Sequence, residues 1–204
     1  GDIYTNGSWR LGARSNYALK YKFRGSFNFN YDNNINSLKG FDDYSKSTQY
    51  NIQWSHSQDA AANPNATLSA SVNMGSSKYF KESLNEFSTS SFLNNTLNSS
   101  ISYSKKFVGT PFNLSLSATH SQNTNTQDIN MTLPSMVLNM DRIYPFAPKN
   151  GSKKNAIHRI SLNYNLNGRY DIRTNDDDFL SKRMFEGART GMKHTVSLST
   201  NMKM

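Results

Sequence analysis

Basic side chains alternate with aromatic and aliphatic ones along much of this chain, and they are the residues best placed to do chemistry. Six of them fall on the polar side of alternating runs: Arg10, Arg14, Lys22, Arg24, Arg159 and Arg169. Rings of arginine or lysine inside a pore select anions, so these residues are candidates for lining a lumen that handles an anionic substrate. The alternative is that they balance acidic residues on neighbouring strands or on a partner.

The sequence offers little for catalysis or metal binding. The four histidines, at positions 56, 120, 158 and 194, lie on separate expected strands without ligand spacing, and no nucleophile elbow is present. The run Asp176-Asp177-Asp178 could hold a divalent cation, or it could be a solvated loop tip. The absence of cysteine excludes disulfides and thiolate metal sites. We therefore predict no enzymatic activity, no catalytic residue, no metal site and no cofactor.

The element that must position the cations is clearest in residues 17–31, YALKYKFRGSFNFNY. Odd positions are aromatic or apolar apart from Gly25, and even positions are polar or cationic apart from Ala18. A period of two indicates extended chain, because successive side chains leave a strand on opposite faces. An aromatic face opposite a cationic one suits a strand with lipid on one side and a watery lumen on the other. An edge strand of a soluble sheet remains the alternative.

Composition supports strands rather than helices in a membrane. Hydrophobic residues make up 35% of the chain, aromatic residues 12% and charged residues 18%, and the mean hydropathy is −0.72. No run approaches the roughly 18 apolar residues of a membrane helix, so membrane residence would require a β-barrel. The net charge of +9 would suit nucleic acid only if it gathered in a basic patch. The cations alternate along strands instead, so we expect no nucleic-acid partner.

The whole chain predicts an all-β fold: an antiparallel transmembrane β-barrel, with about nine strands of a larger barrel. Short loops, as at 18–20 and 108–111, alternate with long ones, as at 32–46 and 171–190, as in outer-membrane barrels, although the pattern is imperfect at residues 121–128. Alternation is already running at residue 1 and still running at residues 201–204. We therefore expect residues 1–204 to be a partial outer-membrane barrel domain, truncated at both ends.

Aromatic pairs are expected where short turns meet the membrane interface. A three-residue turn at 18–20 would pair Tyr17 with Tyr21, and a four-residue loop at 108–111 would pair Phe107 with Phe112. Both pairs are candidates for an aromatic girdle. Apolar positions change from odd to even at Pro134. Because proline cannot donate to the ladder and a change of parity needs an extra residue, we predict a bulge or a broken pairing there.

Several runs, in this order, resemble a known family. They are GDIYTNGSW at 1–9, QWSHSQD at 53–59 with NPN at 63–65, TLP at 132–134 with RIYPF at 142–146, and NG at 150–151 with GMKH at 191–194. They resemble the barrel of the LPS-assembly outer-membrane protein family, LptD, in a divergent branch rich in asparagine and serine. The resemblance runs through most of the chain and rests on order and spacing.

The resemblance implies localisation in the outer membrane of a Gram-negative cell and a non-covalent role in inserting lipopolysaccharide into the outer leaflet. It also implies a plug lipoprotein and periplasmic bridge proteins as partners, alongside outer-membrane lipid. The family also carries a periplasmic jellyroll domain, whose sequence we do not find in residues 1–204. No residue of the family's lateral gate, where the first and last barrel strands meet, is carried over, and Pro134 is assigned only as a strand-breaking residue. Two alternatives stay open: a generic outer-membrane porin or transporter, and a soluble β-rich surface adhesin.

Overall fold

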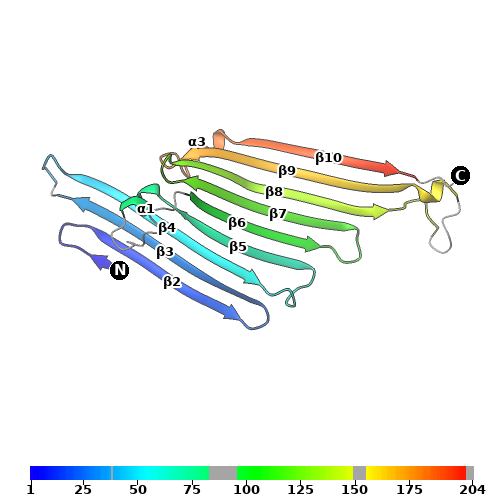
Figure 1. The fold of residues 1–204 in the computed structure, drawn as a ribbon, viewed down its shortest axis with the longest axis horizontal. Helices are drawn as coiled ribbons and strands as arrows, with labels where there is room; N and C mark the ends of the chain where they lie inside the picture. Colours follow the sequence, from blue (N-terminus) through cyan, green and yellow to red (C-terminus); the bar gives the residue numbers. More distant parts are fainter. Residues whose placement is uncertain (38, 83–95, 149–154, 201–204) are drawn as a thin grey trace.

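The computed structural model describes residues 1–37, 39–82, 96–148 and 155–200. Ten antiparallel strands form one sheet whose order follows the sequence, so each strand pairs with the next along the chain (Figure 1). The strands are β1 (Asp2–Ile3), β2 (Trp9–Leu19), β3 (Phe23–Asn36), β4 (Ser45–Gln58), β5 (Ala66–Gly75), β6 (Thr96–Lys106), β7 (Phe112–Asn123), β8 (Asp128–Ile143), β9 (Ser161–Asn175) and β10 (Arg189–Ser199).

The predicted all-β antiparallel fold is confirmed, with ten strands where about nine were expected. The sheet is not closed, and β1 and β10 form its two edges. The helical segments are short: α1 (Ser77–Glu82), the 3₁₀ turn η1 (Ile157–Arg159) and α3 (Lys182–Glu186). None of the helices within the described ranges is long and apolar enough to cross a membrane.

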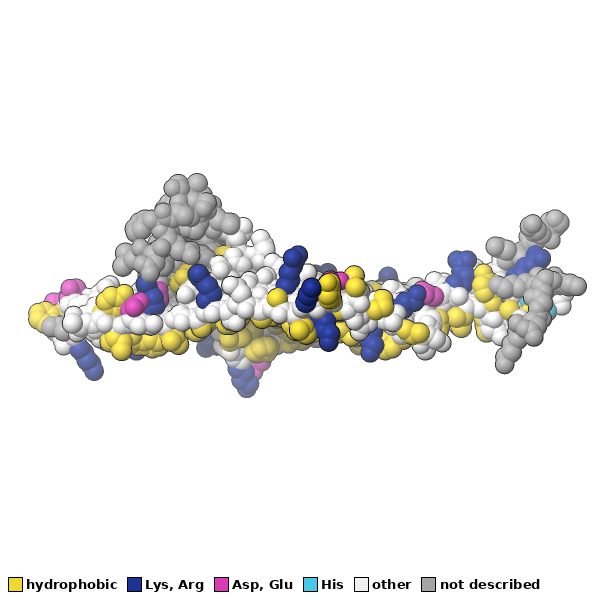
Figure 2. All heavy atoms as spheres, turned by 90° about the horizontal axis from the view of Figure 1, so that it is seen from below, with side chains coloured by type: hydrophobic (Ala, Val, Ile, Leu, Met, Phe, Trp, Pro, Cys, Tyr) yellow, Lys and Arg dark blue, Asp and Glu magenta, His cyan; other side chains and the backbone are white. Residues whose placement is uncertain are grey.

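The register keeps one face of the sheet apolar across all the long strands. Cross-strand pairs on this apolar face include Phe29 with Ile52, Trp54 with Val72, and Leu138 with Leu166. Seen edge-on, hydrophobic side chains gather mainly along the lower side (Figure 2). Many stay open to solvent, including Leu11 at 51% and Leu198 at 68% exposure. An apolar face without a second layer of structure needs another apolar medium to cover it.

The opposite, polar face is tied together by small hydroxyl side chains. Cross-strand hydrogen bonds join Ser26 to Ser55 at 2.8 Å and Ser69 to Ser102 at 2.7 Å. Amide side chains join β8 to β9, where Asn165 donates to Asn139. Such pairs satisfy hydrogen-bonding groups without charge, which explains how a chain with few charged residues still presents a wet surface.

A small buried cluster lies at the end of β8 and β9 from which the loop to β10 leaves. Ile129, Met131 and Ile172 pack there with Met184 of α3, and Tyr170 and Phe179 join from the side. Ser181 caps α3, because its side chain accepts a hydrogen bond from the backbone N–H of Met184. The pairing of Met131 with Ile172 places this cluster on the apolar face, so at this level a helix rather than open surface covers that face.

The change of parity predicted at Pro134 is confirmed as a bulge. On both sides of β8 the register shifts at this point, between Thr132 and Ser135 against β9 and opposite Ser117 and Thr119 of β7. The Leu133–Pro134 peptide is cis. The extra residue lets Ile129 and Met131 stay on the same face as Met136 and Leu138, so the bulge preserves the apolar face.

Two predicted turns are displaced. The turn between β2 and β3 comprises residues 20–22, so Tyr17 pairs with Gly25 and not with Tyr21, which sits in the turn with φ of 61°. The Asn6-Gly7 pair in the sequence predicts a two-residue hairpin turn with Tyr4 opposite Trp9, but Ile3 pairs with Trp9 instead, and Gly7 takes φ of 84°. The Phe107–Phe112 pairing is confirmed, since the Phe107 N–H donates to the Phe112 carbonyl at 3.1 Å.

The strands are longer and the loops shorter than expected. The predicted loop 32–46 shrinks to 37–44, and 121–128 shrinks to the turn 124–127. Asparagine-rich and serine-rich segments continue pairing well past the last apolar residue. Arg159 was expected in a strand but ends η1, because β9 begins only at Ser161. The last predicted strand extended to residue 204, and residues 201–204 lie outside the described part.

Gly25 allows an aromatic ring to lie flat across the apolar face. A Cβ atom at Gly25 would stand 2.3 Å from the Tyr17 ring and 2.5 Å from the Ser55 carbonyl oxygen. The Tyr17 hydroxyl accepts a hydrogen bond from Trp54 Nε1 at 2.8 Å and bonds His56 Nδ1 at 3.0 Å. Three polar groups on an apolar face therefore satisfy one another, which makes this aromatic cluster compatible with lipid.

We expect Gly25→Ala to lower the unfolding free energy of the full-length protein by about 1–3 kcal/mol, because the ring and the backbone cannot both accommodate the added methyl group. Gly191→Ala on β10 is the matched control, since no atom lies within 4 Å of its Cβ position. Urea unfolding in detergent, followed by tryptophan fluorescence, measures both. Equal midpoints for the two variants would contradict this packing.

Candidate functional site

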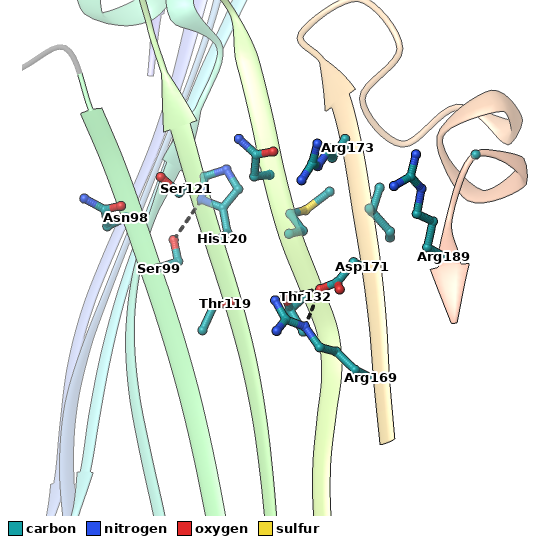
Figure 3. A pocket seen from close by; sticks show the side chains of 14 residues that line it. Asn98, Ser99, Thr119, His120, Ser121, Thr132, Arg169, Asp171, Arg173 and Arg189 are labelled. Carbon is teal, nitrogen blue, oxygen red and sulfur yellow. Dashed lines mark hydrogen bonds and ion pairs between the residues drawn. The ribbon is translucent and has the colours of Figure 1, made fainter. Parts of the chain in front are cut away.

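Three arginines surround a hollow of about 640 Å³ on the polar face, at the end of the sheet where α3 lies (Figure 3). Arg169 and Arg173 come from β9 and Arg189 begins β10. Arg189 pairs directly with Asp171, so the two β9 arginines, two residues before and after Asp171, are its diagonal neighbours. The other lining residues include the neutral donors and acceptors Asn98, Thr119, Ser121 and Asn130, together with His120, Met131 and Ile172.

Asp171 is the one acidic side chain lining this arginine hollow. Its Oδ1 accepts hydrogen bonds from Arg169 Nε at 2.8 Å and from Thr132 Oγ1 at 2.6 Å. Within the described ranges, neither Arg173 nor Arg189 has an ion-pair partner within 4.0 Å. Three cations and one carboxylate leave an excess of two positive charges facing the hollow. Such a surface attracts anions.

The predicted lumen cations do not form one ring: Arg159 lies in η1, and the other five lie on β2, β3, β9 or the turn between β2 and β3. Arg10 bonds Asp32 through Nε at 2.7 Å, and the Asp32 side chain is only 3% exposed. Arg10 thus balances an acidic residue on the neighbouring strand. Arg14 lies opposite Asn28 on the same face and is exposed.

Lys22 and Arg24 come together at the other end of the sheet. With Lys20 and Asp59 they line a smaller hollow of about 350 Å³ beside the turn between β2 and β3. The Lys22 carbonyl accepts a hydrogen bond from the Asp59 backbone N–H at 2.8 Å, which fixes this turn against the next one. Of the six cations proposed from the sequence, only Arg169 reaches the arginine hollow.

Arg173 and Arg189 were missed because residues 171–190 were interpreted as a loop. The signal was present in the alternation Arg169, Asp171, Arg173, which continues the strand period past Tyr170. Charged residues at the end of a strand obscure the apolar pattern that identifies it. Here the polar face alone carries the period.

A polar cluster joins three segments near the same end of the sheet. The Asp176 carboxylate accepts hydrogen bonds from the Ser77 backbone N–H at 2.7 Å and from Gln122 Nε2 at 2.7 Å. Gln122 Nε2 also donates to the Gly75 carbonyl at 2.9 Å. Ser77 and Gln122 are almost fully buried, so this Asp176 lock holds the start of α1 against β7 and the loop after β9.

Two carboxylates of the aspartate run, those of Asp176 and Asp178, interact with other protein groups. Asp176 is engaged in the lock, and Asp178 lies 3.9 Å from Arg183. Over the described ranges, no group of three acidic or histidine side chains is arranged to hold a metal ion. His56 and His194 instead bond tyrosine hydroxyls on the apolar face, Tyr17 and Tyr164 respectively.

An antiparallel sheet with one exposed apolar face and one polar face is the building plan of outer-membrane β-barrels. The family model described as LptD protein matches residues 1–204, and the chain belongs to this family. LptD proteins belong to the outer membrane and act in lipopolysaccharide transport and assembly, not as enzymes. No curated protein and no solved structure gives a significant match.

We expect Arg10→Gln to destabilise the protein by about 3 kcal/mol, because it leaves the buried Asp32 carboxylate without its counter-charge. Arg14→Gln is the control, since Arg14 is exposed on the same strand and should change stability by less than about 0.5 kcal/mol. Adding Asp32→Asn to Arg10→Gln should recover most of the loss. If the double variant is no more stable than Arg10→Gln alone, the ion pair is not the cause.

Proposed function

We propose that this protein moves lipopolysaccharide through the outer membrane and releases it into the outer leaflet. The main support is that the LptD family model matches all of residues 1–204. These residues form a sheet with one apolar and one polar face. An amphipathic glycolipid needs both surfaces: its acyl chains require an apolar medium, and its sugars and phosphates require a polar path.

The open edges of the sheet support a multi-pass barrel larger than ten strands. Unpaired backbone N–H and C=O groups at β1 and β10 would cost several kcal/mol each in lipid, so further strands would have to cover them. Residues 1–204 would then be a partial barrel domain. The apolar face would contact lipid, and the polar face would line the lumen.

Loop lengths support one orientation of the sheet. The turns 20–22, 59–65 and 107–111 lie at one end of the sheet, while the longer connections that leave β3 at residue 37, β5 at residue 76 and β9 at residue 176 start at the other end. Outer-membrane barrels keep short turns in the periplasm and long loops outside. Three connections depart from this pattern: the long one that leaves β8 at residue 144 starts at the short-turn end, and the short turns 4–8 and 124–127 lie at the other end. In this orientation α1, α3 and the arginine hollow lie toward the cell exterior.

Transport in this scheme is non-covalent and needs no cofactor. The polar face, with its serine and asparagine ladders, would let sugar hydroxyls exchange hydrogen bonds without strong binding, while exposed arginines hold the anionic groups. A plug lipoprotein inside the lumen and periplasmic bridge proteins that deliver the lipid are the proposed partners. Aromatic residues at the short-turn end, Tyr17, Tyr21, Phe107 and Phe112, would form the girdle at the periplasmic interface.

The membrane placement predicts opposite responses on the two faces of β7. Leu116 lies on the apolar face between Tyr103 and Met136, and its neighbour Ser115 lies on the polar face. Leu116→Arg should cost about 2–4 kcal/mol near the bilayer midplane and reduce the folded protein in the outer membrane, whereas Ser115→Arg should be tolerated. Heat-modifiable mobility in membrane fractions measures this. Equal tolerance would contradict a lipid-facing Leu116.

Depletion of the full-length protein should reduce lipopolysaccharide at the cell surface and cause it to accumulate before the outer leaflet. The measurement is the surface fraction of lipopolysaccharide that an impermeant probe can label. Re-expression restores it, and re-expression of Leu116→Arg does not. An unchanged surface fraction after depletion would reject the proposed function and leave a general porin as the better candidate.

A further inference from the structure

We propose that the arginine hollow is a binding site for a phosphate monoester on the sugar portion of the transported lipid, held chiefly by Arg173 and Arg189. This inference deepens the proposed function and rests on it. It concerns two residues that the sequence patterns did not single out, and it assigns one location on the polar face for the anionic group.

The three arginines differ in their ion pairing. Arg169 is engaged, since its Nε lies 2.8 Å from Asp171 Oδ1, the oxygen that also accepts from Thr132. Arg173 and Arg189 are exposed on the same face and, among the described residues, form no ion pair within 4.0 Å. Two guanidinium groups on neighbouring strands are therefore available, and Asp171 keeps the third in place beside them.

Two free guanidinium groups favour a phosphate as their ligand. Each presents a planar fork of N–H donors that matches two oxygens of a phosphate. A terminal phosphate monoester carries up to two negative charges and three free oxygens, which matches the excess of two positive charges here. A phosphodiester within a glycerophospholipid offers one charge and two free oxygens, so it is the poorer match.

Several other side chains that line the hollow suit a sugar. Asn98, Ser121 and Asn130 are neutral side chains that can both donate and accept hydrogen bonds, as sugar hydroxyls require. The hollow, at about 640 Å³, is within the usual size of small-ligand sites. A phosphate with the sugar that bears it would fill such a space.

The position of the arginine hollow along the strands also suits a headgroup. Asp171 lies four residues before Asn175, the last residue of β9, or roughly 13 Å along the strand at 3.3 Å per residue. On the apolar face at the same level, Ile172 is 1% exposed and packs with Met184 of α3. Farther along the sheet, on β10, Val196 and Leu198 are 61% and 68% exposed. Open apolar surface thus begins below the hollow, which places the arginines at the level of outer-leaflet headgroups.

The test is site-specific photo-crosslinking in cells that express the full-length protein. p-Benzoylphenylalanine replaces Asn98, which lines the hollow, or Asn28, which lies on the polar face of β3 outside it. Each is combined with unchanged arginines, with Arg173→Gln plus Arg189→Gln, or with Arg173→Lys plus Arg189→Lys. Yields are normalised to folded protein from heat-modifiable mobility.

We expect the crosslink from position 98 to lipopolysaccharide to fall at least fivefold with the glutamine pair and to keep about half its yield with the lysine pair. The crosslink from position 28 should be unchanged. Equal loss at both positions, or no loss at position 98, would overturn the site while leaving the proposed function in place. A crosslink from position 98 to a protein in place of lipid would show that an acidic partner surface fills the hollow, which also overturns it.

A second arm identifies the phosphate with the purified full-length protein in dodecylmaltoside. The probes are lipid A with its phosphates, lipid A after phosphatase treatment, and phosphatidylglycerol. The crosslink from position 98 should be at least fivefold stronger with phosphorylated lipid A than with the other two. Equal yields would overturn recognition of a phosphate monoester. If the proposed function itself were wrong, a different result would show it: surface lipopolysaccharide would stay normal after depletion of the protein.

Discussion

Everything in this sheet depends on keeping each apolar side chain on one face of a single layer. A strand has a period of two, so one residue gained or lost in a pairing would move all later side chains to the wrong face. The turn at 20–22 preserves the parity between β2 and β3, and the loop 108–111 reverses it in step with the sequence. At Pro134 the parity changes within β8, and the bulge absorbs the change. Over the described ranges no second sheet packs against this one, and α3 covers only one end of the apolar face, so other packing would do little to correct an error.

The same constraint explains where polar groups occur on the apolar face. Tyr17, Trp54 and His56 satisfy one another there, and Tyr164 bonds His194 at 2.7 Å. His56 and His194 thus each have a tyrosine hydroxyl as partner where water would be scarce. On the polar face the requirement is relaxed, so serine and asparagine pairs suffice, and exposed cations such as Arg14 need no acid. The buried Asp32 is different, and Arg10 neutralises it.

Much of the fold could be predicted from periodicity, since alternating apolar residues identify β2, β3, β7 and β9, and the switch at Pro134 identifies the bulge. Turn positions were less accessible: the turn after β2 has a tyrosine at positive φ, where glycine or asparagine would have been the signal. Strand ends rich in asparagine and serine have no apolar period and resemble loops. The arginine hollow depends on register between β9 and β10, and the Arg10–Asp32 pair depends on register between β2 and β3. Such contacts between distant residues follow from pairing, which local pattern alone does not specify.

The Asp176 lock has a consequence for the order in which the sheet can be completed. Its carboxylate lies after β9, whereas its donors lie at the start of α1 and near the end of β7, 99 and 54 residues earlier. Strands β1 to β7 can pair one after another using neighbours only, but the start of α1 cannot acquire its anchor until β8 and β9 have been added. The Asp176 lock can therefore form only late in assembly of the sheet. In a chain folded only as far as β7, Gln122 and the backbone N–H of Ser77 would lack the carboxylate that accepts their hydrogen bonds. In such an intermediate the strands up to β7 would stay paired while the start of α1 lacked this anchor.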